Sequence, residues 1–530
     1  MTAYVVDNTE SRRVKFSRLE RRGIVLGLSG EQVTWLGVGA AILMTCIVSG
    51  GFPGGFFKGL VLAALPALIG ATSWRGTPTI TWIRLGIAHL LRTITGQDKY
   101  RSRPGERTQA RQRADQKNRK DAQRQNKSLK GKKVDPPVRI RLPGEASELL
   151  CYTMDNGCAL LHDPVHNTAT VIAQVGSEGF SLKDAAEQDS RVTNWSQMLQ
   201  SFATHPGVIR IQTLDRTVVH PSMDILEYYE RESAAADAGA NINALADASY
   251  RDLVRSAATH TRHDMYLVVV LSETRLRKTI RELKGGIAAL MFLADTEMQA
   301  ITRDMPDAGA KIQRWLTPRE LGEVLRAAFD PAATDDLGSR TGEMVGADVE
   351  TAGPMGGELG WREMRTDSSY HRSYWVGEWP RVGVDPGFLK SLMFAGDFIH
   401  TVSLIAEPIP TTQALKKAEK DLEDAHSSIR LAAKMGRTPT RQQQKEADDI
   451  ADREEDLVDG HGEVRFFGVV TVSAPTLREL VANETQLMHG ASHSKVELRI
   501  LYGQQYPGFL TGGVPLGRGL AKRNLPWGGQ

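Results

Sequence analysis

The chain has 530 residues, of which 41% are hydrophobic and 24% are charged, and its mean hydropathy is −0.31. This length allows several domains, and this composition excludes a protein that lies mostly inside a membrane. The net charge of +3 is unevenly divided, because residues 1–135 hold 24 Lys and Arg against 9 Asp and Glu, while residues 136–530 hold 42 against 54. A basic N-terminal part with a balance of +15 therefore precedes an acidic body with a balance of −12.

Two apolar stretches follow a basic tail at residues 1–30 and open the segment 31–98. The first stretch, 33–51, contains no charged residue, and the second, 56–74, contains only Lys58. Each is close to the ~20 mostly apolar residues that an α-helix needs to cross a hydrocarbon layer of ~30 Å. The two stretches therefore predict a transmembrane hairpin.

The alternative for these stretches is a buried helical hairpin inside a soluble domain. Against it stand the absence of charge, the Gly- and Pro-rich turn at residues 51–55, and the positions of Trp35 and Trp74, since tryptophan rings prefer the membrane interface. A secretory signal is also excluded, because about thirty polar residues precede the first stretch and no small-residue cleavage site follows it.

The distribution of Lys and Arg predicts the orientation of the hairpin. Basic residues flank both of its outer ends, and the turn has none. Because an excess of Lys and Arg marks the cytoplasmic side, we expect a two-pass protein of the inner membrane with both termini in the cytoplasm. Three cysteines, Cys46, Cys151 and Cys158, form no dense disulfide framework, which agrees with a reducing compartment. The flanking basic residues are Arg12, Arg13, Lys15, Arg18, Arg21 and Arg22 before the hairpin, and Arg75, Arg84, Arg92, Lys99, Arg101 and Arg103 after it.

An amphipathic helix is expected at residues 77–94, where apolar residues recur at helical spacing. This helix can lie along the cytoplasmic membrane surface or pack on the soluble body, and the sequence leaves both open. Residues 99–137 are expected to be a disordered basic linker, because 99–133 hold 14 Lys and Arg, only three acidic residues and almost no apolar residue.

The basic linker has three candidate roles. It can be a solvated tether, it can attract anionic lipid at ~1 kcal/mol per basic residue near the surface, or it can bind nucleic acid non-specifically through phosphate contacts. Attraction to lipid is favoured over nucleic-acid binding, because the linker follows the membrane hairpin directly.

From residue 138 the pattern changes to short strands and helices, which predicts an α+β fold with two mixed lobes in the cytoplasm. The first lobe covers 138–331, a linker covers 332–360, and the second lobe covers 361–520, before a C-terminal tail at 521–530. Within the second lobe, two long and highly charged helical segments predict a helical hairpin at 411–458 that projects from the body.

The expected elements of the two lobes follow from periodicity and capping signals. The run 265–271 is continuously apolar and suits a strand buried on both faces. Thr317, Pro318 and Glu320 fit the N-cap, first turn and capping box of a helix. Expected strands are 148–154, 158–162, 167–175, 208–214, 265–271, 373–379, 403–406, 466–472 and 496–501, and expected helices are 182–203, 223–230, 242–258, 287–305, 317–329 and 476–489.

A phosphate-binding loop is not found. Such a loop needs Gly before Lys and Ser or Thr, so that backbone N–H groups can face the phosphates. The pairs that begin at Lys127, Lys278 and Lys390 follow Asn, Arg and Leu instead.

The histidine pairs His162/His166 and His489/His493 are each four residues apart, a spacing that can place two metal ligands on one helix face. The first pair adjoins a turn at Asp163-Pro164, and the second lies at a helix end, so surface or core histidines are favoured over ligands. The sequence therefore predicts no catalytic, cofactor-binding or metal-binding residue, no cofactor and no enzyme activity in this chain.

The order of parts resembles a fusion of two secretion components. The tail, hairpin and amphipathic helix look like the small inner-membrane subunit of conjugative type IV secretion systems, the PrgI-like type. Residues of about 138–520 resemble the N-terminal, non-motor part of the CagE/TrbE/VirB-type conjugation ATPase. The matching segments are Gly179–Leu182 before the helix that carries Trp195, Val208–Thr217, Tyr250–Thr261 with Tyr266–Val270, and Tyr506–Arg518.

In that family a segment similar to Tyr506–Arg518 leads into the motor, whereas here the sequence reaches Gln530 without a P-loop. The resemblance therefore implies a split arrangement, similar to that of actinobacterial conjugation-type gene clusters. We expect a non-enzymatic component that anchors and docks a separately encoded conjugation-type ATPase, contacts other secretion-channel subunits and forms a homo- or hetero-oligomer. The expected docking surfaces are the hairpin 411–458 and the tail 503–530.

Three other functions stay open. A type VII secretion membrane subunit also joins two spanning helices to a cytoplasmic domain, although the segment 506–518 speaks against it. A membrane-bound hydrolase or transferase of unrecognised type is disfavoured by the motif search. A membrane-tethered protein that binds nucleic acid through 99–133 would show a steep salt dependence without sequence preference.

Overall fold

The computed structural model describes residues 3–6, 13–16, 30–74, 77–102 and 134–519. Short gaps within the last range lie at 178, 180–182, 203–204, 206, 222–225, 227–228, 231, 234–242, 257–258, 381–382, 435–440 and 459–462. Most of the predicted basic linker, the tail 521–530 and much of the helix expected at 223–230 therefore lie outside the described residues.

The N-terminal part is built from helices, with two short antiparallel strand pairs beside them. Strands β1 (Ala3–Val6) and β2 (Arg13–Phe16) pair antiparallel inside the predicted tail. Helix α1 (Gly30–Gly50), a π-helical segment (Gly51–Gly55) and α2 (Phe56–Ala71) cover the two apolar stretches. The short strands β3 (Ser73–Trp74) and β4 (Thr77–Pro78) then lead into α3 (Thr79–Ile94), the expected amphipathic helix.

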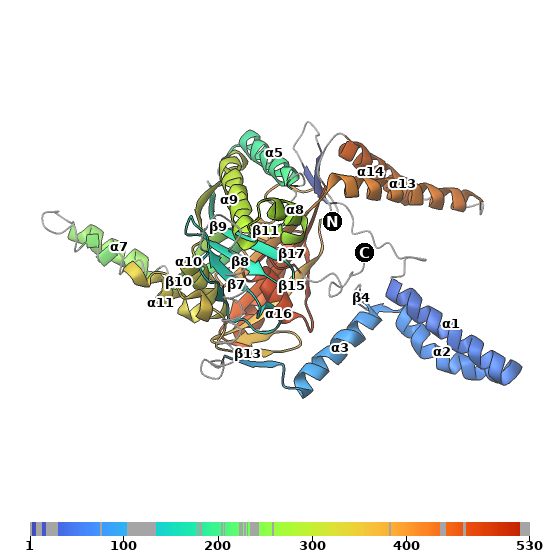
Figure 1. Cartoon of the computed structure of the whole chain (residues 1–530). Helices are drawn as coiled ribbons and strands as arrows, with labels where there is room; N and C mark the ends of the chain where they lie inside the picture. Colours follow the sequence, from blue (N-terminus) through green and yellow to red (C-terminus); the bar gives the residue numbers. More distant parts are fainter. Residues whose placement is uncertain are drawn as a thin grey trace.

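Fourteen of the described strands form one sheet in which all pairings are antiparallel (Figure 1). The main path runs β5-β13-β14-β15-β17-β16-β10-β11-β9-β8-β7-β6, and β12 and β18 join β9 and β15. The bounds are β5 (Lys99–Arg101), β6 (Val138–Arg139), β7 (Leu150–Thr153), β8 (Ala159–Asp163), β9 (Thr168–Ser177), β10 (Val208–Pro221), β11 (Thr259–Ser272), β12 (Ala310–Trp315), β13 (Gly356–Leu359), β14 (Met364–Thr366), β15 (Ser369–Glu378), β16 (His400–Ile409), β17 (Glu463–Ala474) and β18 (Glu497–Ile500).

The sheet has a packed apolar layer on each face because its central strands are apolar on both sides. In β11, Val268 and Val270 belong to one buried cluster, while Leu267 and Val269 belong to another on the opposite face. This alternation confirms the prediction of a strand buried on both faces at 265–271.

Helices cover both faces of the sheet. Leu325 of α10 and Phe509 of α16 complete the first cluster, and Leu290 of α9 belongs to the second. A third cluster joins α15 to the strands of the predicted second lobe. The bounds of the covering helices are α5 (Ala185–Ser201), α8 (Glu273–Glu282), α9 (Ile287–Asp304), α10 (Pro318–Phe329), α11 (Thr334–Gly338), α12 (Lys390–Met393), α15 (Leu477–His493) and α16 (Gln505–Gly512).

The two predicted lobes share this sheet. Strand β10 of the first lobe pairs with β16 of the second, from Ile211 opposite Ala406 to Thr217 opposite His400. This pairing satisfies backbone groups that would otherwise form exposed sheet edges.

Two predicted linkers contain ordered structure. Strand β5 lies inside the residues expected to be disordered and pairs with β13, Tyr100 standing opposite Gly357. The prediction is corrected at this end, because the backbone of 99–101 completes the edge of the sheet. The linker predicted at 332–360 includes α11 and β13, and its Val349 and Ala352 are buried in the first cluster.

Helix α7 and the pair α13–α14 project from the body in Figure 1, apart from the N-terminal helices α1 and α2. Helix α7 (Ala244–Ser256) points away on one side. Helices α13 (Thr411–Lys434) and α14 (Arg441–Val458) lie next to each other and extend on another side, at the positions of the predicted hairpin 411–458. Ala414, Ala418 and Leu457 form a small buried cluster between them.

Candidate functional site

The segment Gly30–Ala71 presents apolar side chains to its surroundings. Its mean hydropathy reaches 1.8 over eighteen residues, and only 6% of that window is buried. Val48, Phe52 and Val61 are more than 70% exposed, whereas the buried positions of α2 are Gly59, Ala63, Pro66 and Gly70. Among the described residues, this is the one helical segment long and apolar enough to cross a membrane. The prediction of two membrane passes stays a prediction.

Small residues bring α1 and α2 into contact. A Cβ atom placed on Gly70 would lie 2.9 Å from the carbonyl oxygen of Gln32, and one on Gly59 would lie 2.9 Å from the Cβ atom of Cys46. The chain direction of the two arms is therefore opposite. Between them the helix is interrupted at Phe52, whose φ of −98° and ψ of 134° are extended rather than helical.

An aromatic ladder joins the end of α2 to the body. The rings of Trp74 and Trp82 are 5.1 Å apart, the Trp82 ring is 5.4 Å from that of Tyr502, and Trp361 lies 6.4 Å from Trp82. His89 stacks 5.3 Å from Trp361 on the next turns of α3. Aromatic pairs of this kind stabilise a contact by more than the burial of their apolar area alone.

Helix α3 packs on the body with one face and exposes an apolar face. Residues 82, 85, 89 and 92 are on the packed face, where the Arg92 Nη1 atom donates to the Gly503 carbonyl oxygen at 3.4 Å. The other face carries apolar side chains that are between 37% and 72% exposed, namely Ile83, Ile87, Leu90, Leu91 and Ile94. The sequence allowed this helix either to lie on a membrane surface or to pack on the soluble body. In the structure one face packs on the body, and the other exposes apolar side chains.

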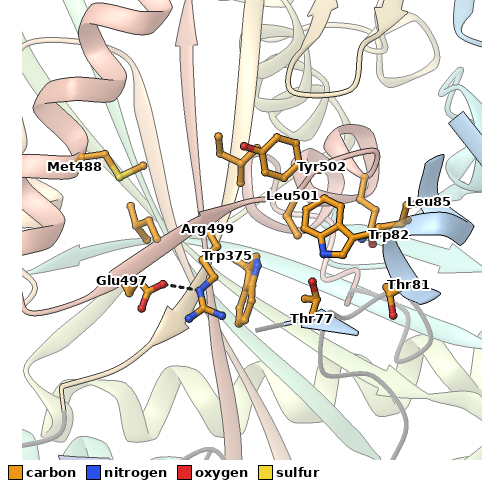
Figure 2. Close-up of a pocket in the computed structure, with 13 residues that line it drawn as sticks. Thr77, Thr81, Trp82, Leu85, Trp375, Met488, Glu497, Arg499, Leu501 and Tyr502 are labelled. Atoms are coloured by element: carbon orange, nitrogen blue, oxygen red, sulfur yellow. Dashed lines mark hydrogen bonds and ion pairs between the residues drawn. The ribbon is translucent and has the colours of Figure 1, made fainter. Parts of the chain in front are cut away.

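A cavity of about 340 Å³ lies between α3 and the body. Figure 2 shows Trp82 and Leu85 of α3 on one wall, with Trp375, Leu501 and Met488 on the body side. The wall is mostly apolar, and its polar rim comes from the start of α3 and from the β18 strand and its exit. This size is at the lower end of the ~300–1,000 Å³ found for small-molecule sites.

The charged groups in this wall neutralise each other. Arg499 lies 5.6 Å from the Trp375 ring, its Nε atom is 2.6 Å from Glu497, and its Nη2 atom is 3.5 Å from Glu378. In contrast, the Gln504 Oε1 atom is buried and accepts no hydrogen bond from the described residues, although a buried acceptor without a donor is costly.

The two predicted histidine pairs do not come together as metal sites. His162 contacts Glu273 at 3.2 Å, His166 contacts Asp163 at 2.9 Å, and His489 and His493 are exposed on α15. No group of three or more His, Cys, Asp or Glu suited to a metal occurs among the residues that the structure describes.

A carboxylate, an imidazole and a hydroxyl do meet on β10 and β11. The His263 Nδ1 atom lies 3.1 Å from Asp215 and 3.5 Å from the Thr217 hydroxyl, and the Asp215 hydrogen bond raises the pKa of this histidine. A hydrolytic triad uses one ring nitrogen for the carboxylate and the other for the nucleophile. Here both partners approach the same nitrogen, so this cluster lacks the triad geometry.

A second buried histidine is held neutral inside the sheet. His371 is fully buried between the hydroxyls of Thr366, at 2.6 Å, and Ser473, at 2.7 Å. Burial, and to a lesser degree the charge of Arg216, lower its pKa from 6.5 to about 3. This arrangement suits a structural polar group in the core.

The segment 504–517 belongs to the tail 503–530 that was expected to dock a partner, and the structure buries most of this segment in the body. Tyr506, Phe509, Leu510 and Val514 are part of the first buried cluster, and the Gly517 N–H donates to the Gln212 side chain at 3.2 Å. Burial of these side chains holds the segment against the sheet. Residues 520–530 lie outside the described residues.

Searches of protein-family models and of curated proteins give no match to this chain. A function for this chain is therefore inferred from the described geometry and from the resemblance expected from its sequence. Sequence reasoning named Trp35 and Trp74 but missed Trp361, Tyr502 and Gln504 as partners of α3. Nothing in a single sequence pairs positions that are some 280 to 420 residues apart.

Proposed function

We propose that this chain is a membrane-anchored, non-catalytic platform of a type IV secretion or conjugation-like apparatus. The segment Gly30–Ala71 anchors it in the inner membrane, and the α+β body docks a separately encoded ATPase on the cytoplasmic side. We infer the anchor from the apolar side chains that this segment exposes. Only 6% of its most apolar window of eighteen residues is buried.

The length of the segment supports two membrane passes. At 1.5 Å per residue, the 21 residues of α1 span ~32 Å and the 16 residues of α2 span ~24 Å, each close to the ~30 Å hydrocarbon layer. Glycines at the contact between the arms agree with the way in which transmembrane helices associate. The basic residues on both flanks support a cytoplasmic location of both termini.

The assignment to a secretion apparatus rests on the family resemblance. Three of its matching segments meet in the centre of the body: 208–217 lies in β10, 266–270 lies in the neighbouring β11, and 506–518 packs beneath both strands. Two others do not join them, because 250–256 belongs to the projecting helix α7 and most of 179–182 lies outside the described residues. The three central segments form one structural unit, which supports a likeness of fold over a chance likeness of scattered motifs.

The hairpin α13–α14 is the proposed docking site for the ATPase. It projects from the body, and α14 carries seven acidic residues against three basic ones. A partner with a basic surface would match this helix, and long-range attraction would speed its association.

Co-purification from native membranes in mild detergent tests this function. We expect a P-loop ATPase in stoichiometric amount with the wild type and at least about tenfold less with Asp448→Lys and Glu455→Lys together, because charge reversal at an interface costs more than 1.4 kcal/mol. Glu282→Lys on the exposed surface of α8 is the matched control and should leave the yield unchanged.

Recovery of the chain alone, or with type VII secretion subunits, would contradict the secretion assignment. Equal recovery of the ATPase with all variants would mean that the ATPase does not dock on α14. The amount of the chain in the membrane fraction is measured in the same preparation. Loss of the chain from this fraction would contradict the anchor, whereas both outcomes above require that the chain stays in it.

A further inference from the structure

The cavity between α3 and the body has no role in anchoring or docking as proposed above. It opens where the chain leaves the apolar segment, since Thr77 and Thr81 at its rim follow Ala71, the end of α2, by only a few residues. If the anchor lies in the bilayer, this cavity lies at the membrane interface, within reach of lipid.

We propose that this cavity binds a membrane lipid, with an acyl chain on the aromatic wall and a headgroup hydroxyl or ammonium on Gln504. This inference rests on the proposed membrane anchor. It commits to lipid because the cavity lies at the start of α3, directly after the apolar segment that ends at Ala71, and because α3 also exposes an apolar face that would contact the bilayer.

The walls favour an apolar chain over a charged solute. Trp82, Leu85, Trp375 and Met488 supply most of the surface (Figure 2). Arg499 is held by two carboxylates and a tryptophan ring, so its charge is already compensated. An anionic metabolite would therefore find no free cation among the described residues that line the cavity.

Gln504 adds a polar requirement. This residue is only 4% exposed, and its Oε1 atom has no hydrogen-bond donor within the described part of the chain. A ligand that carries a hydroxyl or ammonium group would satisfy this atom, whereas a hydrocarbon alone would leave it unpaired. Phosphatidylglycerol and phosphatidylethanolamine carry such donors, and phosphatidylcholine does not.

Photo-crosslinking in vesicles tests the proposal. The full chain is reconstituted in phosphatidylglycerol and phosphatidylethanolamine vesicles with a trace of phosphatidylglycerol that carries a diazirine on its acyl chain. After irradiation we expect label on Met488 or Leu498, two body residues that line the cavity. The same probe with a phosphatidylcholine headgroup should label them about fivefold less, the effect of one hydrogen bond.

Two variants fill the cavity, one from each wall, so that misfolding of one variant does not decide the test. Leu85→Trp and Met488→Trp fill the cavity from opposite sides and should each lower the label on Leu498 about tenfold. Leu90→Trp is the matched control on the exposed face of α3 and should not change it. Gln504→Leu should remove the preference for phosphatidylglycerol over phosphatidylcholine.

Label confined to α1, α2 and the exposed face of α3 would overturn the proposal, and so would label on Leu498 that both filling variants leave unchanged. An unlabelled cavity in a chain that remains in the vesicles would also indicate another occupant, such as an extended partner segment on β18. A chain that does not remain in the vesicles would instead overturn the anchor itself, and with it this inference.

Discussion

The anchor and the body of this protein are built with opposite patterns. In the body, large apolar side chains are buried. The ring centroids of the buried Phe329 and Phe509, for example, are 5.2 Å apart. In α1 and α2, side chains such as Val48 and Val61 are exposed, and glycines occupy the contact. The body follows the rule for a fold in water, where apolar area leaves the solvent. The pattern of α1 and α2 is the one expected for a fold in lipid, where close backbone packing replaces that driving force, and it agrees with the proposed anchor.

Phe509→Ala tests the water-adapted side of this comparison and has the largest expected effect. Phe509 is 1% exposed and contacts Phe329 and His371, so its truncation should lower the free energy of unfolding by about 4 kcal/mol. Urea unfolding of the detergent-solubilised chain, followed by tryptophan fluorescence, measures the loss. Phe292→Ala, at a position 62% exposed on α9, should change it by no more than about 0.5 kcal/mol.

Val61→Arg tests the lipid-adapted side. An arginine at the centre of a membrane helix costs about 3 kcal/mol of insertion free energy, so this variant should be depleted from the membrane fraction after alkaline extraction. Leu245→Arg on α7 is matched in exposure, at 76% against 75% for Val61, and should stay in the membrane. Equal retention of both variants would mean that Val61 faces water.

His371 tests a second feature of the body, namely a neutral polar group that is buried within the sheet. Its folded pKa of about 3 is below the unfolded value of 6.5, so below pH 6.5 the unfolded chain takes up a proton that the folded chain does not. The stability contributed by this group is present above pH 6.5 and is lost as the pH falls toward 3. Between pH 7 and pH 4.5 the loss is roughly 2 to 3 kcal/mol.

His371→Gln should remove that part of the acid sensitivity, measured by urea unfolding at the two pH values. The control is His489→Gln on the exposed surface of α15. If His371→Gln lost as much stability as the wild type between pH 7 and pH 4.5, titration of His371 would not contribute to acid unfolding.

Gly59→Leu has the smallest expected effect and separates the two faces of the anchor. A Cβ atom at Gly59 meets Cys46 and Leu43 at 2.9 to 3.0 Å, so a leucine should push the arms apart and cost about 2 kcal/mol. Gly37→Leu places the same side chain where no atom lies within 4 Å and should be neutral. The fraction folded in lipid nanodiscs at increasing dodecyl sulfate concentration distinguishes the two, and a comparable effect of both would contradict the contact between the arms.

Local signals in the sequence predicted many elements of the body. The capping box at Thr317 and Glu320 starts α10 as expected, and the apolar run at 265–271 became the central strand β11. Helix α16 was missed because Pro507 and its glycines suggest coil, and burial on all sides overrides that preference. Helix α8 was missed because only Leu276 and Ile280 are buried on it.

Contacts between distant parts could not be read from the sequence. The pairing of β10 with β16 and the packing of Trp82 on Tyr502 join segments that are hundreds of residues apart, and no local pattern records them. The unpaired acceptor of Gln504 is likewise a product of tertiary burial. In the anchor, the sequence predicted the apolar character, and the glycine contacts emerge only from the packing of the arms.

Accessibility of single cysteines in intact cells tests the anchor most directly. Gly54→Cys in the turn and Gly86→Cys on α3 both have no atom within 4 Å of the new Cβ, and both are made in a chain with its three native cysteines replaced by Ala. A membrane-impermeant maleimide should label Gly54→Cys from outside, and Gly86→Cys only after the cells are opened. If Gly54→Cys stayed unlabelled in intact cells and reacted together with Gly86→Cys after opening, the two-pass anchor would be contradicted.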